Sequence, residues 1–149
     1  MRLILLALFL TACGGYAIVD PAQTERVYQV EHGETSQLAA FDQIDEWVAL
    51  SWRSAQDVVQ TKNERTGTVV VKWITPATQA GTPKRVHSTA LIKVTDTTAT
   101  FTLLASPSAQ DKAIIASVVA QVYREWDTLL ASTPWGPAQI TKAGYVPPK

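Results

Sequence analysis

The sequence has little of what disulfides, metal centres and nucleic-acid-binding surfaces require. Its 149 residues include one cysteine and two histidines, which excludes an internal disulfide and any metal site built from several cysteines. Lys and Arg total 13 and Asp and Glu total 13, so the formal net charge is zero. Proteins that bind duplex nucleic acid normally carry a basic stripe, so we expect no nucleic-acid partner. The apolar run at residues 3–10 is less than half of the roughly 20 residues that span a bilayer.

Catalytic and metal-binding motifs are also missing. The sequence contains no Gly-x-Ser-x-Gly, no His-Glu-x-x-His and no calcium loop. We therefore expect no cofactor, no metal and no enzymatic activity. The alternative is a hydrolytic enzyme of unrecognised type that uses His87 or His32 with an acid brought close by folding. A pocket that holds one of these histidines beside a carboxylate would favour that alternative.

The N-terminal segment is typical of a secretory signal. Arg2 is followed by the apolar run and then by small residues. Cys13 comes directly after Leu10-Thr11-Ala12, and this order resembles the bacterial lipoprotein signal. The resemblance implies that residues 1–12 are a cleaved signal peptide, that Cys13 is lipidated, and that residues 13–25 are a short tether to the membrane. An ordinary signal peptide with a chance cysteine is the alternative. Gly14 stands where Asp marks inner-membrane retention, so we expect the outer membrane, facing the periplasm.

Hydrophobic periodicity predicts a single α+β domain over residues 26–131. Polar and apolar residues alternate over 26–31, 86–94 and 98–104, and β-branched residues fill 68–74, so these segments and 58–60 are predicted strands. Apolar residues three or four apart predict helices over 36–52 and 108–131, the first with a buried stripe that starts at Leu38. The Pro- and Gly-containing stretches 75–85 and 132–149 are predicted to be a loop and an irregular tail.

The predicted element order is β-α-β-β-β-β-α. Each helix has one apolar stripe, which favours a mainly antiparallel sheet of four to five strands with both helices packed on one face. The other face of the sheet is expected to be open. Because no motif suggests catalysis, we expect any function to reside on that open face.

One stretch of the sequence resembles a known family. It comprises a helix that ends in Glu46-Trp47, an aromatic residue at Trp52, the pair Ser54-Ala55, the short strand that ends at Gln60, and a turn with Gly67. This pattern resembles an uncharacterised family of bacterial secreted and lipoprotein domains of unknown function, with a TATA-binding-protein-like fold, over about residues 27–104. Trp52 stands where Phe is usual. The resemblance implies the fold but no activity, because function lies in sites rather than in folds.

These observations favour a membrane-anchored, non-enzymatic binding or accessory domain of the cell envelope. Its expected partners are the membrane, through the lipid on Cys13, and an envelope protein or peptide. Trp135, in a Pro-Trp-Gly-Pro segment without an inferred packing partner, is a candidate contact residue; the alternative is that it covers one end of the domain. The other candidate contacts are the threonines on the open face, Thr98, Thr100 and Thr102.

Overall fold

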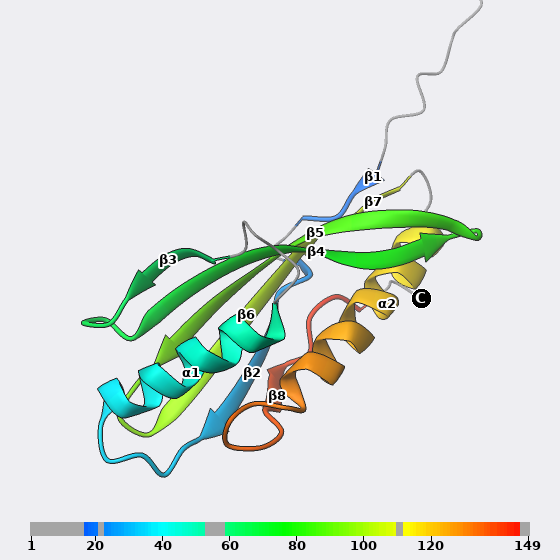
Figure 1. Cartoon of the computed structure of the whole chain (residues 1–149). Helices are drawn as coiled ribbons and strands as arrows, with labels where there is room; N and C mark the ends of the chain where they lie inside the picture. Colours follow the sequence, from blue (N-terminus) through cyan, green and yellow to red (C-terminus); the bar gives the residue numbers. More distant parts are fainter. Residues whose placement is uncertain (1–16, 21–22, 53–58, 110–111, 147–149) are drawn as a thin grey trace, which may run out of the picture.

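Two helices cover one face of an antiparallel sheet in the structure, a computed structural model that describes residues 17–20, 23–52, 59–109 and 112–146 (Figure 1). Cys13 and the predicted signal peptide lie outside the described residues. The elements are β1 (Ala17–Ile18), β2 (Arg26–Glu31), α1 (Gln37–Ser51), β3 (Val59–Asn63), β4 (Thr68–Gln79), β5 (Thr82–Val94), β6 (Thr98–Ser106), β7 (Ser108–Ala109), α2 (Lys112–Leu130) and β8 (Gln139–Lys142).

The main sheet has six strands in the order β3-β4-β5-β6-β2-β8, and every neighbouring pair is antiparallel. The predicted α+β class, and the placement of both helices on one face, are confirmed. The sheet has more strands than the predicted four to five because the C-terminal segment contributes one. β1 and β7 form a separate two-stranded sheet.

The prediction of an irregular tail is therefore partly wrong, and part of the predicted tether pairs with the domain. Within the tail, Gln139–Lys142 forms β8 and pairs with β2. The other edge of β2 is taken by β6, so without β8 a row of backbone N–H and C=O groups would be unpaired. Within the tether, Ala17 and Ile18 pair with Ala109 and Ser108. Such short pairings carry little periodicity, so the sequence alone did not reveal them.

The predicted loop over residues 75–85 is instead a hairpin extension, which we call the arm (residues 75–86). β4 and β5 pair continuously as far as Gln79 and Thr82. Ala80 and Gly81 have φ of 48° and 78°, as a tight two-residue hairpin turn requires. β3 pairs with β4 only over Thr68–Val71, and β6 pairs with β5 only as far as His87. In the arm, each strand therefore has one edge without a partner strand, and a proline, which has no backbone N–H, is tolerated at such an edge.

Helix α1 begins as predicted. Ser36 is the N-cap, and its hydroxyl accepts a hydrogen bond from the backbone N–H of Ala39 at 3.2 Å. The predicted stripe is wrong at its first position, because Leu38 is 54% exposed while Trp47 is buried. At about 100° per residue, Leu38 lies about 120° around the helix from the buried Ile44, and Trp47 only about 60°. α2 matches the predicted second helix except at its start, because Ser108 and Ala109 form β7 and pair with β1 instead.

Aromatic rings connect both helices to the sheet. Trp73 faces the helices together with Val69 and Val71. Ring centroids lie 5.7 Å apart for Phe101–Trp47, 5.5 Å for Trp47–Trp52, 5.3 Å for Trp52–Trp73, 6.5 Å for Trp73–Trp126 and 5.4 Å for Trp126–Tyr123. Most of the tryptophans are thus explained by packing.

Candidate functional site

The candidate site is the face of the main sheet that carries no helix. Alternate residues of β5 and β6 are buried under the helices, and the residues between them point to the other side. No described helix covers this second side (Figure 1). We call it the open face. Its outward-pointing residues are Val27, Gln29 and Glu31 on β2, Val70, Lys72 and Ile74 on β4, His87, Thr89, Leu91 and Lys93 on β5, and Thr98, Thr100, Thr102 and Leu104 on β6.

An apolar row crosses the middle of the open face. Val70 pairs with Leu91, Leu91 pairs with Thr102, and Thr102 pairs with Val27, so these four side chains lie side by side across four strands. Leu91 is 42% exposed. On a sheet face that meets water, polar residues are the usual occupants. The row is therefore a surface on which a partner would remove apolar area from water.

The three predicted threonines do lie on the open face, and each is half-buried. Thr102 belongs to the apolar row. Thr100 lies between Lys93 and Gln29, and Thr98 pairs with Glu31 at the end of the sheet. Sequence reasoning missed the apolar members of the site. The available signal was Leu91, an apolar residue on the polar side of its strand.

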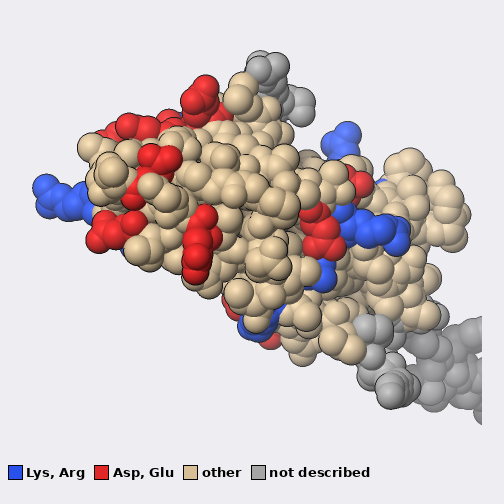
Figure 2. All heavy atoms as spheres, turned by 90° about the horizontal axis from the view of Figure 1, so that it is seen from below, with Lys and Arg blue, Asp and Glu red and all other residues tan. Residues whose placement is uncertain are grey.

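Charge is distributed unevenly between the two sides of the molecule. No Asp or Glu occurs between Arg65 and Asp96, so the β4–β5 hairpin carries only basic charged residues, and β6 carries none of either sign. Helix α1 carries acidic residues and no Lys or Arg. Figure 2 shows acidic side chains gathered toward the side on which α1 lies. The basic residues of the hairpin are Lys72, Lys84, Arg85 and Lys93.

Trp135 does not lie on the open face. Its ring packs against that of His32, with centroids 4.9 Å apart, just beyond the end of β2. It is half-buried and contacts the core. The structure therefore separates Trp135 from the three threonines and places it over one end of the domain. A contact role for Trp135 stays a prediction.

The two histidines lie in different surroundings. Nε2 of His32 is 2.9 Å from the carbonyl oxygen of Thr95. His87 is exposed on the open face, between Ile74 and Ser106. In the described part of the chain, neither ring forms an ion pair with a carboxylate, and no group of His, Cys, Asp and Glu is arranged to hold a metal ion. The pairing that the hydrolase alternative requires is not found at either histidine.

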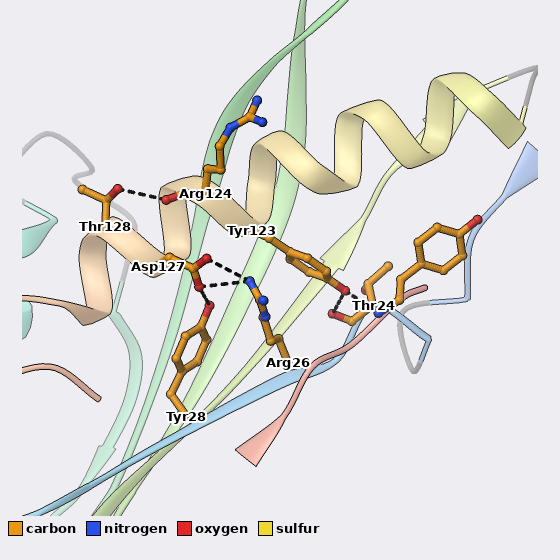
Figure 3. Close-up of polar contacts among 8 residues, drawn as sticks. Thr24, Arg26, Tyr28, Tyr123, Arg124, Asp127 and Thr128 are labelled. Carbon is orange, nitrogen blue, oxygen red and sulfur yellow. Dashed lines mark hydrogen bonds and ion pairs between the residues drawn. The ribbon is translucent and has the colours of Figure 1, made fainter. Parts of the chain in front are cut away.

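A polar cluster joins β2 to α2 on the helix side (Figure 3). The hydroxyl of Tyr28 donates to Oδ1 of Asp127 at 2.7 Å, and the guanidinium of Arg26 contacts the same carboxylate at 3.0 Å. The guanidinium also lies over the ring of Tyr123, 4.5 Å from its centroid. The Tyr123 hydroxyl donates to the carbonyl of Thr24 at 3.1 Å.

Both phenols of this cluster have raised pKa values. Burial is the main cause for Tyr28, and its hydrogen bond to Asp127 adds to the rise in pKa. Burial also raises the pKa of Tyr123. The two phenols stay protonated at neutral pH and act as hydrogen-bond donors. This cluster therefore fixes α2 on the sheet.

Two solved structures are similar to parts of the chain. Among solved structures the chain is similar to a TBP-like protein from Parabacteroides distasonis, with a TM-score of 0.46 and 21% identity, over 56% of this chain and 54% of that one. It is also similar to a DUF4468 family protein from Bacteroides ovatus, with a TM-score of 0.46 and 12% identity, over 72% of this chain and 88% of that one. The chain thus matches about half the length of the first protein. The two names correspond to the descriptions predicted from the sequence, and at this level of similarity they carry no argument about activity.

No protein-family profile matches the chain, and no curated protein does. Within the described ranges, neither helix is long and apolar enough to cross a membrane.

Proposed function

We propose that this protein is a lipid-anchored, non-enzymatic domain of the bacterial envelope that binds a partner polypeptide through its open face. The observation that carries the proposal is the apolar row Val70–Leu91–Thr102–Val27 on a sheet face without a covering element. The anchor is the lipid on Cys13, suggested by the signal-like sequence before it. The outer membrane, facing the periplasm, is the proposed location.

The chemistry of the open face defines the partner. The apolar row supplies area for burial, and the threonines beside it supply hydroxyl groups that donate and accept hydrogen bonds. Lys72 lies two residues after Val70 on β4, and Lys93 lies two residues after Leu91 on β5. Because β4 and β5 are antiparallel, the two lysines lie on opposite sides of the apolar row, and no acidic residue lies on β4, β5 or β6. A partner surface with apolar side chains and flanking Asp or Glu complements this arrangement.

Site-specific crosslinking in cells tests the proposal. A photoreactive residue at Leu91 should capture one protein from the envelope, while the same residue at Glu125, exposed on α2, should not. Leu91→Asp should abolish capture from a photoreactive residue at Thr102, because it places a charge in the apolar row. Leu50→Asp, the same substitution at a similarly exposed leucine on α1, on the other side of the sheet, is the matched control and should leave capture intact.

Cys13→Ser separates the anchor from the surface. We expect this variant to leave the membrane fraction and to lose the crosslink, while the purified partner still binds it in solution. Equal crosslinking from Leu91 and Glu125, or capture from Thr102 that Leu91→Asp does not change, would refute the open face as the binding surface.

A further inference from the structure

We propose that the arm, residues 75–86, is a second membrane contact that orients the domain on the bilayer. This inference rests on the proposed lipid anchor at Cys13. The arm end of the molecule then faces the lipid headgroups, and the end that carries His32 and Trp135 points away from the membrane. Four observations support this orientation: the reach of the anchor, the position of β1, the rigidity of the arm and the distribution of charge.

The anchor has a short reach. β1 begins at Ala17, four residues after Cys13. An extended chain spans at most about 3.6 Å per residue, so Cys13 lies within about 14 Å of Ala17. A lipidated Cys13 at the bilayer surface therefore keeps the β1 end of the domain close to the headgroups, whatever conformation the intervening residues adopt.

β1 lies at the base of the arm. Ile18 pairs with Ser108 on β7, and β7 follows β6, whose last residue, Ser106, pairs with His87 on β5. From His87 the arm runs on to its turn at Ala80 and Gly81, beyond the last residue of β6. Figure 1 shows β1 and β7 beside the arm end of the hairpin. The anchor and the arm thus belong to the same end of the molecule.

The arm is held rigidly. The side-chain hydroxyls of Thr75 and Ser88 are 2.7 Å apart and buried between β4 and β5. The Gln121 side chain on α2 accepts a hydrogen bond from the backbone N–H of Thr78 at 2.9 Å and donates one to its carbonyl at 2.9 Å. Charged groups on the arm are therefore held in place before they meet a membrane, and little further ordering of the backbone is needed.

Charge favours this end for contact with anionic lipid. Lys84 and Arg85 are exposed on the arm, and the arm contains no acidic residue. At the opposite end, exposed Glu31, Glu64 and Asp96 are balanced by exposed Lys62, Arg65 and Lys93. An anionic bilayer therefore attracts the arm more strongly than it attracts the opposite end, where the charges largely cancel. Each Lys or Arg near such a surface strengthens binding about fivefold, so the arm pair supplies roughly 25-fold at low salt.

Depth-dependent quenching measures the orientation. The full lipidated chain, with Cys13 acylated, carries a single added thiol for a fluorophore, either Thr82→Cys on the arm or Thr97→Cys in the β5–β6 turn; both sites are exposed. The protein is placed in vesicles of phosphatidylcholine and phosphatidylglycerol that contain headgroup-labelled quencher lipids. We expect strong quenching at residue 82 and little at residue 97. Equal quenching at both sites, or stronger quenching at residue 97, overturns the proposal.

Charge reversal tests the chemistry. Lys84→Glu/Arg85→Glu should weaken binding of the unlipidated Cys13→Ser chain to these vesicles by about 25-fold or more and remove the difference in quenching on the lipidated chain. The matched control, Arg65→Glu/Lys72→Glu, makes the same charge change away from the arm and should retain both. Equal effects of the two pairs overturn the arm as the contact.

The same experiment distinguishes failure of the anchor from failure of the orientation. If the full chain is not lipidated and does not stay with the vesicles, the proposed anchor is wrong, and this inference is wrong with it. If the chain is lipidated and vesicle-bound but residues 82 and 97 are quenched equally, the anchor holds and only the orientation is overturned.

Discussion

Asp127 connects α2 to β2, and we expect its removal to destabilise the domain. Its carboxylate accepts hydrogen bonds from the Tyr28 hydroxyl at 2.7 Å and from the Arg26 guanidinium at 3.0 and 3.2 Å. The Asp127 side chain is 46% exposed, whereas Tyr28 is 1% exposed. Asp127→Ala therefore leaves a buried hydroxyl and a largely buried guanidinium without their acceptor.

The magnitude follows from these burial differences. A buried donor left without a partner costs about 1–3 kcal/mol. The ion pair with Arg26 adds only about 0–1 kcal/mol, because solvent screens the half-exposed carboxylate. Asp127→Ala should thus lower the free energy of unfolding by about 2–3 kcal/mol. For a domain of this size that corresponds to a fall in Tm of about 10 °C.

Urea and thermal unfolding, followed by tryptophan fluorescence, provide the assay. Glu125→Ala, at an exposed site on the same helix, is the control and should change the free energy of unfolding by less than about 0.5 kcal/mol. Tyr28→Phe removes the hydroxyl that Asp127→Ala leaves unpaired, so the double variant should be less destabilised than the sum of the singles by about 1 kcal/mol. Additive effects, or an Asp127→Ala loss no larger than that of the control, would refute this reasoning.

Three further predictions concern backbone strain and pH. Gly67→Ala should destabilise the domain by about 1–3 kcal/mol in urea unfolding, because Gly67 has φ of 61° and an added Cβ would collide with the carbonyl oxygen of Val94. Ala80→Asn should instead raise the free energy of unfolding, measured in urea, by about 0.5–1 kcal/mol, because Asn accepts φ of 48° better than Ala does. Folding raises the phenol pKa of Tyr28 and Tyr123. The two protonated phenols therefore contribute fully to the free energy of unfolding below the ordinary tyrosine pKa of about 10, and this contribution decreases as the pH rises above that value. Stability measured from pH 9 to 12 should fall by up to about 1.4 kcal/mol per pH unit per tyrosine, and less steeply in Tyr28→Phe; a flat profile would contradict the shift.

The candidate site was only partly predictable. Strand alternation placed Thr98, Thr100 and Thr102 on the outward face, and the structure agrees. Which outward residues of other strands lie beside them depends on register, and a shift of one residue exchanges the two faces of a strand. The apolar row that joins Val27 and Val70 through Leu91 therefore emerged only from the pairing of β2, β4, β5 and β6.

By itself the sequence determined the parts of the fold in which a local pattern is long and regular. The helix that begins at the Ser36 N-cap, the second helix and the four longer strands all follow from periods of 3.6 or 2 residues, because burial of one face imposes that period. Tertiary structure decided the rest. β8 and β1 form because a neighbouring strand has an unpaired edge, the arm forms because two proline-containing segments meet across a tight turn, and Trp135 packs on a residue about 100 positions away. Each of these depends on contacts between distant segments, and no local pattern in the chain encodes them.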